Sequence, residues 1–119
     1  MSKKDEAREE RIYEVIADAN DSEERAMGWY CYLDDRISFP FAAECVAADK
    51  RSPLELREQI TVLRMSDENY CGHDIYVDIS WKGKPLSIPL AQIEPLDDGE
   101  DTAEAVGDWR YWKNQGNEF

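Results

Sequence analysis

The chain has 119 residues, of which 42% are hydrophobic and 34% charged, and its 27 acids outnumber its 14 bases to give a formal net charge of −13. This length and apolar content predict one small domain with one core and argue against disorder along the whole chain. The negative charge argues against nucleic-acid binding, because a polyanion is repelled, and favours a cation or a basic partner.

The first third of the chain predicts two helices. Within residues 3–19, apolar residues recur at the i, i+3, i+4, i+7 spacing of an amphipathic helix, and residues 1–10 include a candidate frayed end. Asp21 can cap a second helix, since Glu24 stands three residues later as in a capping box. We expect this second helix to end near residues 34–35.

Beyond residue 36 the apolar pattern changes to the two-residue alternation of strands. It predicts a strand over residues 37–45, in which Pro40 indicates an edge position or a bulge because proline lacks an amide donor. Residues 59–65 are rich in isoleucine, valine and leucine and predict a second strand. The polar stretch 67–73, which contains Gly72, predicts a loop.

The last third of the chain predicts a hairpin, a linker and a helix. Alternation in residues 75–81 and 86–90, joined by the turn residues 82–85, predicts a hairpin with one buried face. Residues 94–104 form a predicted acidic linker. Apolar residues at helical spacing then predict a helix over residues 105–116 that Gly116 ends, and all four tryptophans fall on predicted buried faces.

The order of these elements predicts an α+β fold for residues 1–119 as a single domain. Two N-terminal helices precede at least four short strands, and one C-terminal helix follows them. Because the strands follow one another without helical crossovers, we expect an antiparallel sheet. Strands this short, with a bulge, favour a small SH3-like β-barrel over a sandwich.

The distribution of acids indicates a site for a hard cation. Residues 12–24 hold five acids and residues 85–109 hold seven, and neither stretch contains a lysine or an arginine. Ca²⁺ takes about six to eight oxygen ligands and needs several converging carboxylates. Since two acidic stretches are present, we expect the protein to bind one or two Ca²⁺ ions. The candidate ligands are Asp97, Asp98, Asp101 and Glu104, with Asp34 and Asp35 approaching them, and a second group of Asp18, Asp21 and Glu24.

Structural roles compete with metal binding for several of these acids. Asp101 with Glu104 and Asp21 with Glu24 both fit capping boxes. The alternative to metal binding for these two pairs is therefore that they cap helices and bind no ion. Residues 34–35 lie at a predicted helix end, where the macrodipole disfavours negative charge unless a cation or Arg36 compensates.

Two stretches resemble parts of the EF-hand pattern without satisfying it. Asp18-x-Asn20-x-Ser22 matches three ligand positions but lacks the required glycine and the final glutamate. The second stretch, from Asp67 to Asp78, contains a cysteine at a ligand position and is flanked by strands, so we interpret it as a coincidence.

Other functional classes have weaker support. The three cysteines, Cys31, Cys45 and Cys71, and the single histidine, His73, lack the spacing of a zinc site or of a disulfide framework, so we expect reduced thiols. No patterned nucleophile or glycine-rich phosphate loop is present, and we predict that the protein is not an enzyme. The alternative function is an acidic interaction module that binds a basic protein.

The sequence also predicts where the protein resides. It contains no apolar run of the roughly 18 residues that span a bilayer, and no hydrophobic segment of a secretion signal follows its first residues. We therefore expect a cytoplasmic protein, a monomer, without a membrane partner.

Four blocks of sequence occur in a distinctive order along the chain. They are Asp18-Ala19-Asn20-Asp21 with Gly28-Trp29-Tyr30-Cys31-Tyr32-Leu33, Phe39-Pro40-Phe41-x-Ala43, Ile88-Pro89-Leu90, and Asp108-Trp109-x-Tyr111-Trp112. Over residues 11 to about 113, the sequence with these blocks resembles one known family, the cyanobacterial calcium-binding protein family CcbP. The resemblance implies a cytosolic calcium-binding protein, distinct from the EF-hand class, that buffers or senses free Ca²⁺ in a setting linked to heterocyst differentiation.

Overall fold

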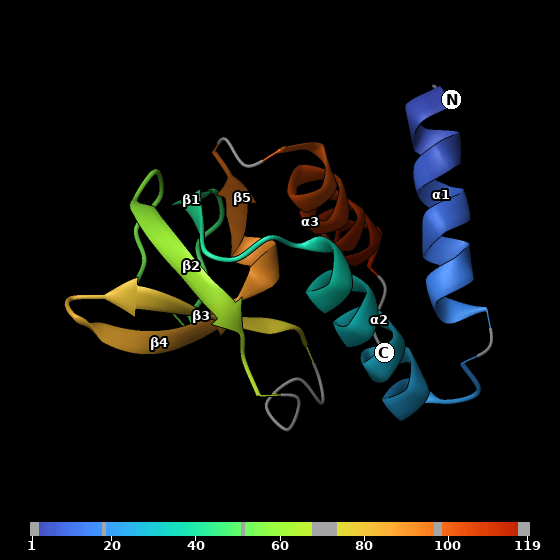
Figure 1. The fold of residues 1–119 in the computed structure, drawn as a ribbon, viewed down its shortest axis with the longest axis horizontal. Coiled ribbons are helices and arrows are strands. Elements are labelled where there is room, and N and C mark those ends of the chain that lie inside the picture. Colours follow the sequence, from blue (N-terminus) through green and yellow to red (C-terminus); the bar gives the residue numbers. More distant parts are fainter. Residues whose placement is uncertain (1–2, 18, 51, 68–73, 97–98, 117–119) are drawn as a thin grey trace.

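The part of the chain that the structure describes folds into three α-helices and a five-stranded antiparallel sheet (Figure 1). The structure is a computed structural model and describes residues 3–17, 19–50, 52–67, 74–96 and 99–116. The predicted α+β class and the order of helices, strands and helix are confirmed. The elements are α1 (Lys3–Ile16), α2 (Ser22–Arg36), β1 (Phe41–Cys45), β2 (Gln59–Met65), β3 (Tyr76–Trp81), β4 (Lys84–Pro89), the 3₁₀ helix η2 (Leu90–Gln92), β5 (Ile93–Pro95) and α3 (Gly99–Asn114).

The sheet has the strand order β4-β3-β2-β1-β5, with every neighbouring pair antiparallel. The ladders between the described strands leave β4 and β5 at the two edges, so the sheet is not closed and the predicted SH3-like barrel is not confirmed. Along the β4 edge, Pro85 lies opposite Ser80 and Pro89 lies opposite Tyr76. Just beyond the strand, the Leu90 amide donates to the Ile75 carbonyl at 2.9 Å.

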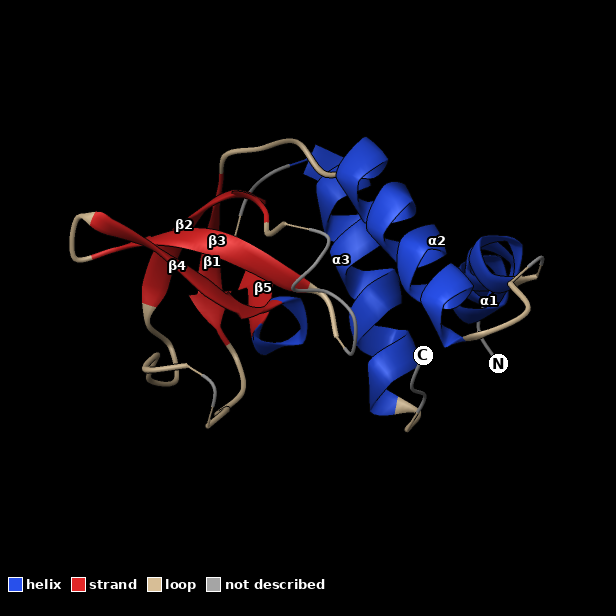
Figure 2. Ribbon diagram, turned by 90° about the horizontal axis from the view of Figure 1, so that it is seen from below, coloured by secondary structure: helices blue, strands red, loops and turns tan. Residues whose placement is uncertain are grey.

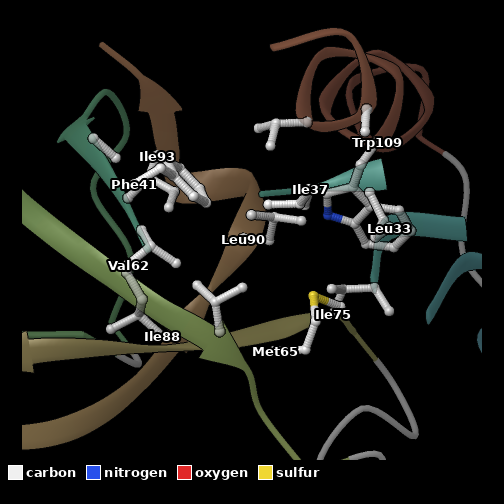
Figure 3. Packing of buried hydrophobic residues seen from close by; sticks show 14 of the residues in the cluster. Leu33, Ile37, Phe41, Val62, Met65, Ile75, Ile88, Leu90, Ile93 and Trp109 are labelled. Carbon is white, nitrogen blue, oxygen red and sulfur yellow. The ribbon is translucent and has the colours of Figure 1, made fainter. Parts of the chain in front are cut away.

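The helices lie on one side of the sheet, and α2 and α3 lie between the sheet and α1 (Figure 2). Side chains from the sheet, α2 and α3 form one core, part of which is drawn in Figure 3. The rings of Trp29 on α2 and Trp109 on α3 meet edge to face, with centroids 5.0 Å apart, and both are fully buried. A β-carbon at Gly28 would lie 2.8 Å from the Val15 carbonyl, so this glycine allows α1 and α2 to approach closely.

Both N-terminal helices are confirmed, although α1 ends at Ile16 rather than at residue 19. The first strand begins at Phe41 rather than at residue 37, because the Ser38 amide donates to Thr102 Oγ1 on α3 at 2.9 Å instead of joining a ladder. The predicted edge position of this strand is wrong, since β1 pairs with both β2 and β5. Pro40 precedes β1 and therefore removes no donor from its ladders.

The predicted acidic linker over residues 94–104 is wrong at both of its ends. Ile93–Pro95 forms β5, which pairs with β1 and is too short for alternation to reveal it. Helix α3 then begins at Gly99, six residues before the predicted start, so part of the acidic stretch forms its first two turns. Acids are favourable there, because the helix macrodipole places partial positive charge at the N-terminus. The helix ends near Gly116, as predicted, with this glycine at φ +85°.

The remaining predictions for the sheet are largely correct. β2 spans the predicted residues 59–65, and β3 and β4 form the predicted hairpin, with positive φ at Lys82 and Gly83 in its turn. Three of the four tryptophans are buried, but Trp81 is only half-buried, with Lys82 Nζ 5.3 Å from its ring centroid. Residues 68–73, most of the predicted loop, lie outside the described part of the chain.

The three helices meet at the carboxylate of Asp108, which is fully buried on α3. Arg8 Nε lies 2.9 Å from Oδ1, while Arg11 donates to both carboxylate oxygens at 2.9 and 3.0 Å. The hydroxyl of Tyr32 on α2 donates to Oδ2 at 2.6 Å. A β-carbon at Gly107 would lie 2.9 Å from Arg8 Nη2, so Gly107 leaves room for Arg8 to reach the carboxylate.

We predict that Asp108→Asn lowers the free energy of unfolding by about 2–3 kcal/mol, because it leaves two arginines without their shared counter-charge. The loss stays below that of a wholly buried pair, since the Arg8 and Arg11 side chains are 31% and 22% exposed and can rehydrate. Urea denaturation measures the change. The control is Glu44→Gln, which removes an ion pair to the 88% exposed Arg57 and should cost less than about 1 kcal/mol. Equal losses in the two variants would contradict a central role for Asp108.

Tyr32 gives this network a dependence on alkaline pH. Burial of the phenol, and then its hydrogen bond to Asp108, raise the pKa of Tyr32 above its ordinary value. The stability that this shift contributes is fully present below about pH 10, where an unfolded tyrosine ionises, and is lost as pH rises toward the higher folded-state pKa.

We therefore predict that Tyr32→Phe makes the free energy of unfolding fall less steeply between about pH 10 and 11.5 than it does in the parent protein. Urea denaturation at a series of pH values gives the slope. Tyr13→Phe is the control, because Tyr13 is 69% exposed, and it should keep the parent slope. An unchanged slope in Tyr32→Phe would show that Tyr32 titrates alike in the folded and unfolded states.

Candidate metal centre

The end of α2 and the beginning of α3 lie side by side, as Figure 2 shows. Two contacts join them: the hydrogen bond from Ser38 to Thr102, and an ion pair in which Arg36 Nη1 lies 3.6 Å from Glu104 Oε1. The structure thus places the acids at residues 34–35 near the first turns of α3, where Asp101 and Glu104 lie. Whether these acids bind a metal ion stays a prediction.

The first group of candidate ligands is only partly described. Asp101 is exposed in the first turn of α3, and Glu104 lies one turn later with a 37% exposed side chain. The capping box expected from these two residues is wrong, because α3 begins at Gly99 and Asp101 is already inside the helix. Asp97 and Asp98 lie outside the described residues.

Asp34 and Asp35 are exposed in the last turn of α2. Their charges are unfavourable for the isolated helix, because its C-terminal end carries partial negative charge. Arg36 in the same turn directs its guanidinium to Glu104, and it also lies 4.9 Å from the centroid of the Tyr32 ring. A cation bound between the two helix ends would relieve the repulsion that remains.

The second group of candidate ligands lies at the opposite end of α2. Asp21 is the N-cap of this helix and accepts from the Glu24 amide at 2.9 Å, while Glu24 Oε2 accepts from the Asn20 amide at 2.8 Å. The first bond is that of the predicted capping box, whereas the second reaches the amide of Asn20 rather than that of the N-cap Asp21. Asp18 lies outside the described residues. Since α2 has 15 residues, roughly 20 Å of helix separates this group from residues 34–35.

The donor chemistry of both groups suits a hard cation, but the described residues do not complete a site. Carboxylates are the ligands that Ca²⁺ prefers, and both helix ends present exposed ones. Among residues 3–17, 19–50, 52–67, 74–96 and 99–116, however, no three histidine, cysteine or acidic side chains are grouped to hold a metal ion. A complete shell at the first group therefore requires residues 97–98, a bound water or a shift of side chains.

Among the described candidate ligands, Glu104 forms ion pairs with two arginines. Besides Arg36, it pairs with Arg11, whose Nε lies 3.3 Å from Glu104 Oε1. The pKa of Arg11 is raised above its ordinary value, chiefly by the hydrogen bond to Asp108 and also by the charge of Glu104, so Arg11 stays cationic. Glu104 therefore links the bonds around the buried Asp108 to the exposed acids at the end of α2 and the beginning of α3.

Two well-defined carboxylates escaped the sequence analysis. On β3, Asp78 Oδ1 accepts from the hydroxyls of Ser66 and Ser87 at 2.8 and 2.7 Å, and Oδ2 lies 3.0 Å from Arg64 Nε. The hairpin alternation could have found the contact with Ser87, because residues 78 and 87 are equidistant from the turn. In the sequence, Asp108 is one of seven acids within residues 85–109 and begins the last of the four blocks, and neither feature reveals its partners. Arginines three residues apart on a predicted helix, Arg8 and Arg11, are the signal that could have indicated them.

Two of the three cysteines lie in the described part of the chain. Cys31 is exposed and Cys45 is buried, and both are free thiols, as expected. Cys71 and His73, the other candidate zinc ligands, lie outside the described residues. Among the helices of the described segments, none has the length and apolar character needed to cross a bilayer.

Comparison with known proteins points to one family. The sequence model of a family described as calcium binding, CcbP, matches residues 10–113. The crystal structure of Anabaena CcbP is similar with 40% sequence identity and a TM-score of 0.82, covering 96% of this chain and 94% of that one. A calcium binding protein in its calcium-binding form is 38% identical with a TM-score of 0.84, and the two chains are covered completely. No curated protein sequence matches significantly.

Proposed function

The chain belongs to the CcbP family of calcium-binding proteins, and from this premise we propose that it binds Ca²⁺ and thereby buffers or senses calcium in the cytoplasm. The observation that carries the proposal is the similarity over its whole length to a protein solved in a calcium-binding form. The net charge of −13 supports it, because a cation relieves repulsion among the acids. The cyanobacterial setting and the link to heterocyst differentiation are part of this proposal, and we propose no catalytic activity.

For the principal ion, we propose a site between the end of α2 and the beginning of α3. The contacts that join Ser38 to Thr102 and Arg36 to Glu104 support it, because they bring two exposed acidic helix ends together. Aspartates from both ends can then contribute oxygens to one ion. The proposed ligands are Asp34, Asp35, Asp97, Asp98, Asp101 and Glu104.

We propose that a second Ca²⁺ ion binds more weakly at the beginning of α2, with Asp18, Asp21 and Glu24 as ligands. Backbone amides donate to Oδ1 of Asp21 and to Oε2 of Glu24. Those carboxylates keep a second oxygen each for a cation. Because capping already uses part of their capacity, we expect the first site to bind more tightly.

One observation supports the alternative function, the binding of a basic protein. Helix α1 presents Glu6, Glu10 and Glu14 at four-residue spacing, all exposed, beside Tyr13, which is 69% exposed. A basic partner would be attracted to this acidic face, and salt would weaken the attraction. Coordination of Ca²⁺, in contrast, depends on particular carboxylates, so substitution of single acids distinguishes the two functions.

We predict that Ca²⁺ raises the melting temperature of the metal-free protein. A ligand that binds only the folded state stabilises it by about 2.7 kcal/mol at a concentration one hundred times its Kd, which corresponds to roughly 10 °C for a domain of this size. Differential scanning calorimetry in moderate salt measures the shift. Mg²⁺ should give a smaller shift, because it demands a tighter octahedron and loses water reluctantly. Equal shifts for the two ions would indicate diffuse screening of charge.

Substitution of candidate ligands distinguishes direct coordination of Ca²⁺ from attraction by the overall negative charge of the protein. We predict that Asp34→Asn with Asp101→Asn weakens Ca²⁺ binding at least tenfold by calorimetric titration, because each helix end loses a ligand. The control, Glu6→Gln with Glu10→Gln, removes the same charge from exposed positions on α1 and should change the affinity less than about twofold. Circular dichroism verifies that both variants keep their helices. Equal affinities in the two variants would place the ion elsewhere, with the Asp18, Asp21 and Glu24 group next to be substituted.

A further inference from the structure

The carboxylate of Glu104 is held by cations of the chain itself. Arg11 on α1 and Arg36 on α2 lie 3.3 and 3.6 Å from the same oxygen, Oε1. Arg36 and Glu104 are both about two-fifths exposed, so solvent and ions can reach this pair. Glu104 is therefore a proposed calcium ligand that two guanidinium groups already neutralise.

The sequence of α3 extends this arrangement along one face of the helix. Asp101, Glu104 and Asp108 follow at i, i+3 and i+7, the spacing that aligns side chains on one face. Arg8 and Arg11 of α1 contact the two later acids of this row. The first acid, Asp101, is exposed and lies nearest to the beginning of α3. Thus α1 supplies two arginines to Asp108 and one to Glu104, so its contribution of positive charge decreases toward the proposed calcium site.

We infer that Arg11 and Arg36 set the calcium affinity of this site, because both guanidinium groups lie at Oε1 and Ca²⁺ must displace them before it can coordinate both oxygens of the Glu104 carboxylate. The inference rests on the proposed function. It assigns the two arginines a competing role: they are positioning residues that hold a ligand away from the ion.

Competition for Glu104 couples calcium binding to the docking of α1. When Ca²⁺ takes this carboxylate, α1 loses one of the ion pairs that attach it to α3. The bonds from Arg8 and Arg11 to Asp108 remain, so α1 is loosened rather than released. Linkage requires the coupling to be reciprocal: whatever holds α1 more firmly lowers the calcium affinity by the same factor.

Arg36 is the residue through which to test this inference, because Arg11 also binds the buried Asp108. We predict that Arg36→Gln binds Ca²⁺ about two- to fivefold more tightly than the parent protein, the range expected when a competing exposed ion pair is removed. Arg36→Lys keeps the charge but loses the planar fork, so its affinity should lie between the two.

The control is Lys84→Gln, which removes the same charge from an exposed position at the first residue of β4. The hairpin of β3 and β4 lies away from the helices (Figure 1). Screening should keep its effect on calcium affinity below about 1.5-fold at 0.15 M salt. Calorimetric titration of full-length, metal-stripped protein with Ca²⁺ provides the affinities. If the parent binds Ca²⁺ while Arg36→Gln binds no more tightly than Lys84→Gln, the inference is overturned and the proposed function stands. If the parent binds no Ca²⁺, both are overturned.

Hydrogen exchange of the α1 amides gives a second readout that requires no substitution. Saturating Ca²⁺ should accelerate exchange in α1 of the parent protein about two- to fivefold, while the amides of β2 and β3 exchange no faster. Unchanged or slower exchange in α1 with Ca²⁺ bound would show that Arg11 does not release Glu104, and would overturn the inference.

Discussion

A single buried carboxylate determines how the helical layer of this protein is assembled. Asp108 has no exposed surface, so its charge must be compensated inside the fold, and it accepts from groups on both of the other helices. Hydrophobic contacts have little directionality, whereas the bonds from Arg8, Arg11 and Tyr32 to this carboxylate fix how α1 and α2 lie against α3. Gly107 leaves the space that Arg8 needs in this arrangement.

The same network sorts the acids of α3 by their availability to a cation. Asp108 is committed to structure, Asp101 is exposed, and Glu104 lies between them with partners from two helices. The proposed calcium site is therefore connected to helix packing through one side chain, that of Glu104. A protein with a net charge of −13 gains from this sorting, because its few arginines neutralise the acids that folding requires.

Periodicity predicted the parts of the fold in which one sequence segment determines its own structure. The two N-terminal helices and the hairpin have a clear period, Asp21 caps the second helix, and turn residues join the hairpin strands, while β2 is rich in isoleucine, valine and leucine. Prediction failed where a partner distant in the sequence determines the local structure. The amide of residue 38 donates to Thr102 rather than to a neighbouring strand, and Ile93–Pro95 forms β5 by pairing with β1. The candidate site follows the same rule. Clusters of acids are visible in the sequence, but the ion pairs of Glu104 span 93 and 68 positions and could not be read from spacing.

The edge strand β4 shows how the sheet avoids unwanted association. Because the Leu90 amide faces β3 and alternate residues of an extended strand share a side, the amides of residues 84, 86 and 88 also face β3. The outward positions are then 85, 87 and 89, of which two are prolines and lack the amide hydrogen. A neighbouring chain that tried to extend the sheet would find a single backbone donor, at Ser87, along this strand. The open sheet is thus protected against fibril-like stacking at this edge by its own covalent chemistry.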